Sequence, residues 1–329
     1  MTRRPPVSTA APGPGAPSEP LVRPVRLRPG ARVAVVAPSG PVPADRLEVG
    51  LDLLRGWDLE PVVAPHVLDV HPELDYLAGT DEHRAADLQN AWCDPSVDAV
   101  LCARGGYGAH RMVDLLDWRA IRAAGPKVFV GYSDITVLHE AFALRAGFAT
   151  LHGPMTATEV FLKDAATQEH LRATLFAPET VRTLGLDTAA ALVPGRARGI
   201  LHGGCVSMLA ADLGTPRART SARGGLLLIE DITEDPYRLD GILTRLLRAG
   251  ALDGLSGVVC GSWENCGPYD RVRAVLADRL GGLGIPVVEE LGFGHSPTAL
   301  TIPLGIPAVL DAPAGGGRCT LTAEVPALV

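Results

Sequence analysis

The chain has 329 residues, of which 47% are hydrophobic, and it carries a formal net charge of -7. This length and composition predict a large buried core divided between two domains, and the acidic balance argues against a nucleic-acid or anionic-membrane partner. Lysine occurs only at positions 127 and 163, which excludes a G-K-[ST] phosphate loop and leaves little room for a Ser-Lys dyad or a Schiff base.

The N-terminal segment and the cysteine spacing bear on the compartment of the protein and on metal binding. Residues 1–25 are rich in proline and alanine and lack the apolar run of a secretory signal, so we expect a disordered leader on a cytoplasmic protein. No apolar run reaches membrane-spanning length. The 6 cysteines have no C-x-x-C spacing, which predicts free thiols and no metal site.

From Arg32 onward, apolar strands alternate with amphipathic helices. This alternation predicts an α/β fold: an N-terminal domain over residues 26–165 with a doubly wound, mostly parallel sheet. In such sheets, functional sites form where the strands end. The expected strands are 33–37, 62–63, 98–102 and 127–130, and the expected helices are 51–57, 81–92, 110–116 and 135–147.

A polar, irregular stretch over residues 166–195 predicts a linker, and residues 196–329 then form a second, smaller α/β domain rich in β-strand. Its expected helices lie around 208–213 and 243–247. Its expected strands are 226–229, 258–260, 287–288 and 300–302.

The most informative local pattern is Gly131-Tyr132-Ser133-Asp134, which follows an apolar strand and opens a helix. A serine on such a turn presents its hydroxyl, and the following N–H groups lie at a positive helix end that can stabilise an oxyanion. Ile135 stands where the G-x-S-x-G elbow has its second glycine. The tetrapeptide alone therefore favours an ordinary N-capping serine.

A second loop, from Arg104 to Gly108, is rich in glycine and also follows a strand. It is not a dinucleotide fingerprint, because Arg111 occupies the position of the third glycine. Its spacing fits either an anion cradle of backbone N–H groups or a tight turn that needs positive φ.

A nucleophilic serine needs a base, and histidine is the usual one. The histidines at 66, 71, 83 and 170 are expected at the surface, His110 is expected to cap a helix, and His139 is expected to point away from the serine turn. His152 and His202 stay open, and His295, in the loop 292–297, is best placed. An orienting carboxylate would come from Glu230 or Asp231, and spacing does not choose between them.

Taken together, these segments resemble the LD-carboxypeptidase family, also called muramoyltetrapeptide carboxypeptidases, whose relatives include the microcin C immunity peptidases. The resemblance spans Arg32 to the C-terminus. It rests on eight blocks in the family's order: 37–40 (APSG), 78–81 (AGTD), 104–108 (RGGYG), 131–134 (GYSD), 152–155 (HGPM), 213–216 (LGTP), 229–232 (IEDI), and 294–295 (GH) with 303–305 (PLG).

The resemblance implies a catalytic triad of Ser133, His295 and Glu230, and an oxyanion hole from the backbone N–H groups of Gly106 and Asp134. It also implies no cofactor, a homodimer, and a cytoplasmic murein tetrapeptide as substrate, from which terminal D-alanine is released during wall recycling. The substrate carboxylate needs a cationic partner, for which we nominate Arg104.

This chain departs from the family at His202-Gly203-Gly204-Cys205, where relatives usually read Trp-Gly-Gly-Asn, and at Gly241, where an arginine is common. These changes spare the triad and affect substrate preference. The alternatives are an immunity-type peptidase that cleaves a peptidyl-nucleotide or related acyl adduct, and a non-catalytic binding protein. An aromatic stack for a base between residues 160 and 195 would favour the immunity-type enzyme, but only Phe161 and Phe176 occur there, which favours the carboxypeptidase.

Overall fold

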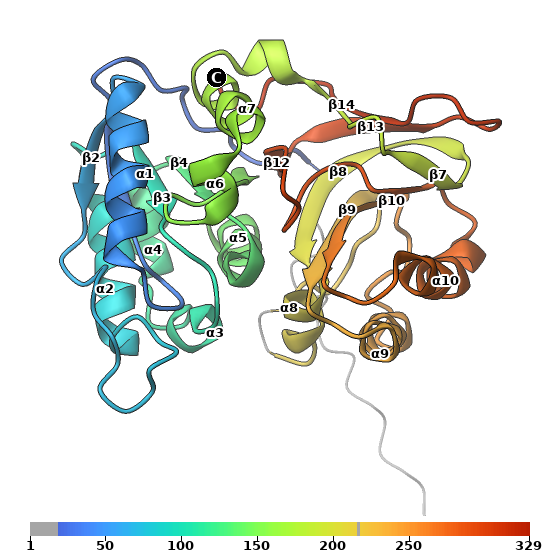
Figure 1. Ribbon diagram of the computed structural model, residues 1–329, viewed down its shortest axis with the longest axis horizontal. Coiled ribbons are helices and arrows are strands. Elements are labelled where there is room, and N and C mark those ends of the chain that lie inside the picture. Colours follow the sequence, from blue (N-terminus) through green and yellow to red (C-terminus); the bar gives the residue numbers. More distant parts are fainter. Residues whose placement is uncertain (1–18, 216–217) are drawn as a thin grey trace, which may run out of the picture.

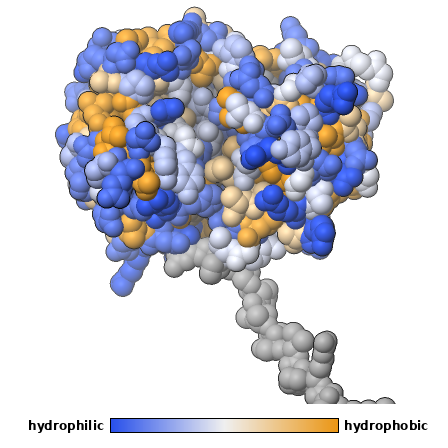
Figure 2. All heavy atoms as spheres, turned by 60° about the horizontal axis from the view of Figure 1, so that its bottom comes forward, coloured by the Kyte–Doolittle hydropathy of each residue, from blue (hydrophilic) through white to orange (hydrophobic). Residues whose placement is uncertain are grey.

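The computed structural model describes residues 19–215 and 218–329, so most of the expected disordered leader lies outside the described residues. Two sheets lie side by side, each with helices packed against it (Figure 1). No helix among the described residues has the length and apolarity needed to cross a membrane. On the face in Figure 2, hydrophilic side chains predominate and hydrophobic ones occur in separate groups.

The first sheet has six strands in the order β12-β5-β4-β3-β1-β2, and all neighbours except β12 and β5 run parallel. Its parallel strands are short and apolar because helices cover both faces. The doubly wound, mostly parallel sheet predicted from the sequence is confirmed. The strands are β1 (Arg32–Val36), β2 (Glu60–Val63), β3 (Ala99–Cys102), β4 (Val128–Gly131), β5 (Thr150–His152) and β12 (Ile302–Leu304).

The helices of this half pack onto two apolar clusters, one on each face of the sheet. One cluster is built around Trp92, Phe129 and Phe142, and the other around Leu54, Leu101 and Phe161. The helices are α1 (Ala44–Gly56), α2 (Asp81–Cys93), α3 (Ala109–Met112), α4 (Trp118–Ala124), α5 (Thr136–Ala141), α6 (Glu159–Lys163) and α7 (Ala165–Phe176).

The second sheet has eight strands in the order β6-β14-β13-β8-β9-β10-β11-β7. Strands β8 to β11 form a parallel centre, and the outer strands are antiparallel. Helices α8 (Val206–Ala211), α9 (Pro236–Arg248) and α10 (Tyr269–Leu280) cover one face (Figure 1). The strands are β6 (Thr183–Leu184), β7 (Ala190–Val193), β8 (Gly195–Cys205), β9 (Gly225–Ile232), β10 (Gly257–Glu264), β11 (Val287–Glu289), β13 (Pro307–Ala312) and β14 (Thr320–Ala323).

Three segments cross between the halves or lie at their border. The strand expected in the second domain near residues 300–302 is instead β12, which pairs with β5 of the first sheet, so that assignment is wrong. The segment expected as a linker, 166–195, contains most of α7 and both edge strands β6 and β7. Near the chain ends, Leu21 N donates to Gly305 O and Val329 N donates to Pro24 O. Long-range contacts therefore tie the two halves together in ways that local patterns do not reveal.

Candidate active site

Ser133 lies on the turn between β4 and α5, as the sequence predicted. Its φ is 64°, in the left-handed region that non-glycine residues seldom adopt. A short 3-10 turn over Ser133–Ile135 leads directly into α5. Strand, strained serine and helix together have the form of a nucleophile elbow, and the second glycine of the lipase-type motif is not needed to build it.

The glycine-rich loop after β3 packs against this serine. A Cβ placed on Gly105 would lie 3.2 Å from Ser133 Oγ, so a larger residue there would press on the hydroxyl. The neighbouring Gly106 has a φ of 112°, which favours glycine, and no hydrogen bond from its backbone N–H is found within the described part of the chain. The loop therefore brings a free backbone donor close to the serine.

Asp134 joins the three loops at this edge of the sheet. Its side chain is 1% exposed, and Oδ2 accepts hydrogen bonds from Ser39 Oγ at 2.7 Å and from Ala109 N at 2.8 Å. Burial raises the pKa of this carboxyl, although both donors oppose the shift. The fully buried Arg84 guanidinium also donates to Pro38 O and Ser39 O. Asp134 thus fixes the elbow relative to the loops after β1 and β3.

Glu230 and His295 form the second part of the site. Glu230, near the end of β9, is 0% exposed, and its Oε2 lies 2.7 Å from His295 Nδ1. Gly294 makes this approach feasible, because a Cβ there would lie 2.6 Å from the same oxygen. With Nδ1 taken by the carboxylate, Nε2 is the ring nitrogen available to a hydroxyl.

The two groups shift each other's titration in opposite directions. Burial alone would raise the pKa of Glu230, but the nearby His295 and His152 outweigh it and lower that pKa. Burial alone would lower the pKa of His295, but the Glu230 carboxylate outweighs it and raises that pKa. The pair therefore favours an ionised carboxylate, and it makes the imidazole a better proton acceptor than an ordinary histidine.

Side-chain contacts bring the serine turn and the histidine loop together. The ring of Tyr132, which precedes Ser133, lies 4.7 Å from the His295 ring, centroid to centroid. Thr136 Oγ1, at the start of α5, accepts from Cys205 N at 2.9 Å. Cys205 in turn pairs with Glu230 across β8 and β9. These contacts of Tyr132 and Thr136 place the serine turn beside the strand that carries Glu230 and the loop that carries His295.

The other histidines occupy different environments. His139 is buried, with Nε2 2.8 Å from Gly131 O and Nδ1 2.9 Å from Thr150 Oγ1, so both nitrogens are engaged. His202 is buried on β8 beside Leu227, and burial lowers its pKa. His170 was expected at the surface but is half-buried, and its Nδ1 accepts from Thr301 N. His152 lies in β5 with Nε2 3.8 Å from Glu230 Oε1.

Arg104, the nominated carboxylate partner, lies on the glycine-rich loop and is exposed. Its guanidinium donates to Pro41 O at 2.8 Å, which orients the side chain across the loop after β1. A guanidinium has five N–H donors, so this single bond leaves others for an anion.

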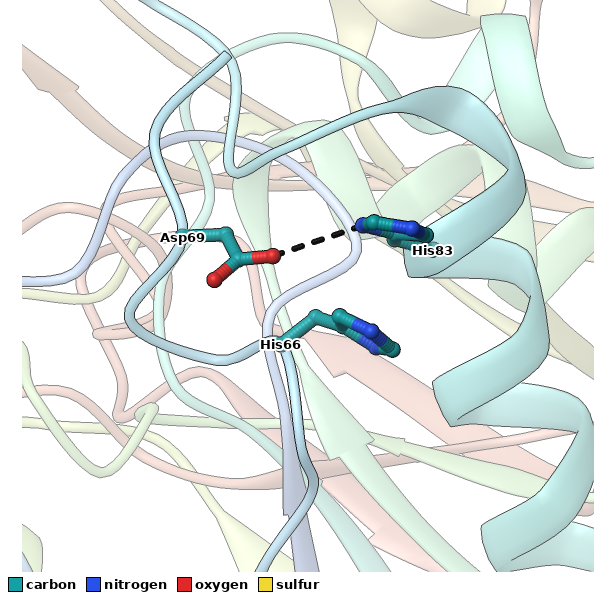
Figure 3. A group of neighbouring side chains, drawn as sticks. All are labelled: His66, Asp69 and His83. Atoms are coloured by element: carbon teal, nitrogen blue, oxygen red, sulfur yellow. Dashed lines mark ion pairs between the residues drawn. The ribbon is translucent and has the colours of Figure 1, made fainter.

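One group of potential metal ligands occurs among the described residues: His66, Asp69 and His83, near β2 and the start of α2 (Figure 3). The two imidazole rings stack with centroids 4.0 Å apart and planes 22° from parallel. Nearly parallel rings direct their in-plane lone pairs side by side, whereas a metal needs them to converge on one point. His66 Nδ1 is also bonded to Asp87 Oδ1 at 2.8 Å. We therefore assign no metal to this group.

Sequence reasoning missed the side chains that support the site. Ser39, Arg84 and the carboxylate of Asp134 were not singled out, because their partners are distant along the chain. Ser39 does belong to the Ala-Pro-Ser-Gly block on which the resemblance rests, and that was the available signal.

Known proteins resemble this chain both in sequence and in fold. Residues 33–153 match the family model described as the LD-carboxypeptidase N-terminal domain, and residues 198–310 match the C-terminal domain. A putative carboxypeptidase of Streptomyces coelicolor is 69% identical, over 94% of this chain and 98% of its own. A muramoyltetrapeptide carboxypeptidase from Oxalobacter formigenes has a similar structure, with a TM-score of 0.76 and 30% identity, covering 90% of this chain and 99% of that chain. An MccF-like protein from Bacillus anthracis shares the fold, with a TM-score of 0.80 and 22% identity, covering 91% of this chain and 98% of that chain.

Proposed function

Because this chain belongs to the LD-carboxypeptidase family and is a carboxypeptidase hydrolase, we propose that it releases terminal D-alanine from murein tetrapeptides by a serine mechanism. The proposal assigns the triad to Ser133, His295 and Glu230. The observation that carries it is the combination of a strained serine turn with a buried Glu-His pair, in contact through the Tyr132 ring.

In the proposed mechanism, His295 Nε2 accepts the Ser133 proton as the hydroxyl oxygen attacks the peptide carbonyl carbon. The resulting imidazolium is stabilised by Glu230, which also holds the tautomer through Nδ1. His295 then donates this proton to the leaving amine of D-alanine. A water molecule, deprotonated by the same imidazole, hydrolyses the acyl-enzyme and regenerates Ser133.

Two further groups are assigned to substrate charge. The N–H groups of Gly106 and Asp134 would stabilise the oxyanion, and the glycine loop packed against Ser133 supports this assignment. Arg104 would bind the terminal carboxylate of the peptide with the donors that Pro41 does not use. Cytoplasmic cell-wall recycling and a homodimer remain predictions from the family resemblance.

The immunity-type alternative would be favoured by an aromatic surface on which a nucleobase can stack. Phe161 is 0% exposed and packs edge-on against Trp57, at 5.7 Å between centroids. Phe176 packs partly buried against the same core and lies beside the Arg172 guanidinium. These two aromatic residues of the 160–195 region are therefore occupied within the fold, which favours the peptide substrate.

The test is to offer a murein tetrapeptide and a peptidyl-adenylate side by side and to identify the products by mass spectrometry. We expect D-alanine release from the tetrapeptide. The Ser133→Ala variant should abolish release while keeping the wild-type circular dichroism spectrum, because it removes only the attacking oxygen. Retained turnover in this variant would exclude Ser133 as the nucleophile. Cleavage of the adenylate alone would favour the immunity-type activity.

A further inference from the structure

His152 is a buried histidine that the proposed triad does not use. It lies in β5 and is 1% exposed, and neither ring nitrogen has a hydrogen-bond partner among the described residues. Buried polar nitrogens without partners are rare in folded proteins because they lose their bonds to water without replacement. The position of this imidazole therefore requires an explanation.

A polar atom of the proposed triad lies close to this ring. Glu230 is bonded to His295 through Oε2, whereas its other oxygen, Oε1, is buried and has no hydrogen-bond partner among the described residues. His152 Nε2 lies 3.8 Å from this Oε1. This ring nitrogen and this carboxylate oxygen are thus unpaired neighbours, and a movement of less than about 1 Å would bring them to hydrogen-bond distance.

Among the residues that the structure describes, His152 has no other charged partner within ion-pair distance. The rings of Tyr132, Phe293 and His139 lie around it, with centroids 6.0, 5.5 and 6.3 Å from its own. Burial lowers the pKa of His139 to about 3, so it is neutral. Burial also raises the pKa of Tyr132, which keeps its phenol protonated. Of the groups facing the ring, only Glu230 is ionised.

We propose that His152 is a positioning residue: a neutral imidazole, protonated at Nε2, that donates to Glu230 Oε1 and so keeps Oε2 directed at His295. This inference rests on the proposed function of the triad. Glu230 would then be held between two imidazoles, one that only donates and one that exchanges a proton with Ser133.

The proposal predicts a change in the chemistry of His295 when the donor is lost. Without the His152 N–H, the negative charge of Glu230 has one fewer donor, so the carboxylate attracts the His295 proton more strongly. The pKa of His295 should rise, and the acid limb of kcat/KM should move to higher pH. Asp231 and Glu264, the other acidic groups acting on His295, are unchanged by the substitution.

The experiment uses His152→Phe, which keeps a planar ring, and His152→Gln, whose carboxamide restores an N–H near the Nε2 position. We expect His152→Phe to lose about tenfold in kcat, the cost of one hydrogen bond to a charged group, with KM unchanged because His152 is enclosed. His152→Gln should recover most of the loss. The matched control is His139→Phe, which removes an equally buried imidazole that does not contact Glu230 and should leave the acid limb in place.

A second readout needs neither substrate nor turnover. Nitrogen-15 NMR of ring-labelled histidines reports the tautomer of His152 and the titration of His295 in the free protein. We expect a neutral Nε2–H tautomer for His152, and an upward-shifted His295 titration in His152→Phe. A different tautomer, a cation, or an unshifted or lowered His295 titration would overturn the proposal. If the wild-type protein released no D-alanine, the proposed function would fall, and these spectra would still decide the role of His152.

Discussion

The elbow side and the histidine side of the site are held in different ways. On the elbow side, Ser133 is fixed by its strained backbone and by several bonds, with Asp134 joining the loops after β1 and β3. On the histidine side, His295 lies on a loop, and the one hydrogen bond of its ring found within the described part of the chain is to the buried Glu230. The proposed nucleophile is thus held by several constraints, whereas the proposed base depends on its hydrogen bond to Glu230. Substitutions on the two sides should differ accordingly.

The largest effect is expected from loss of the hydrogen bond between Glu230 and His295, because this bond orients the imidazole. Glu230→Gln removes the charge that stabilises the imidazolium and allows the wrong His295 tautomer, so kcat should fall by roughly 10^4-fold. Steady-state D-alanine release measures it. Glu289→Gln is the matched control: Glu289 is 4% exposed in the same sheet but bonds Tyr269 and Arg273, so its loss should lower stability and spare turnover. A Glu230→Gln enzyme with near-normal kcat would remove Glu230 from the triad.

The same bond makes activity and stability depend on pH. His295 must be neutral to act as the proposed base, and Glu230 raises its pKa. As the pH is lowered, kcat/KM should therefore begin to fall at a higher pH than it would for an ordinary histidine. Because folding lowers the Glu230 pKa, this group stabilises the fold fully above pH 4.5, its ordinary value. That stabilisation is lost as the pH falls through the pKa of the folded state. Because folding raises the His295 pKa, this group stabilises the fold fully below pH 6.5, its ordinary value. That stabilisation is lost as the pH rises through the pKa of the folded state.

Both contributions are therefore fully present between pH 4.5 and 6.5. The difference in Tm between the wild type and Glu230→Gln should be greatest in that window, measured by thermal unfolding across a pH series. A constant Tm difference from pH 3 to pH 9 would show that the pair is not coupled.

On the elbow side, a smaller effect is expected because other constraints remain. Ser39→Ala removes one of the two donors to Asp134 Oδ2, which should lower the free energy of unfolding by about 1–3 kcal/mol and reduce kcat only a few-fold. Denaturant titration and steady-state kinetics measure the two quantities. Ser96→Ala is the control, since its bond to Asp94 is exposed and should matter little. A loss in kcat as large as that of Glu230→Gln would contradict the contrast between the two sides.

Arg104→Ala tests substrate binding rather than either side of the site. The exposed guanidinium is assigned to the terminal carboxylate, so we expect KM to rise by about tenfold with little change in kcat. Arg119→Ala, an exposed arginine on α4, should leave KM unchanged. An unchanged KM in Arg104→Ala would reassign the carboxylate partner.

The smallest effect, none, is expected from removal of metal ions. The proposed mechanism uses no metal, and the rings of His66 and His83 are stacked nearly parallel (Figure 3). Dialysis against a chelator should leave D-alanine release unchanged. Activity that is lost and then restored by a metal would require a different mechanism.

Sequence patterns predicted the elements that depend on neighbouring residues. The strand, serine turn and helix around Ser133 were visible because apolar spacing changes there from strand-like to helical. The same reasoning assigned residues 300–302 to the second domain, because a short apolar run does not specify which sheet it joins. It also expected His170 at the surface, because the burial of that ring depends on a distant segment.

The sequence by itself determined the α/β class, the elbow at Ser133 and, through family blocks, the residues proposed as the triad. Only the tertiary structure decided which neighbour faces which partner. Successive side chains on a strand point to opposite faces, so Glu230 bonds His295 while Asp231 accepts from Ser207 N. It likewise placed Asp134 between two loops and His152 beside Glu230. Such pairs join residues far apart in the chain, and only the folded chain brings them together.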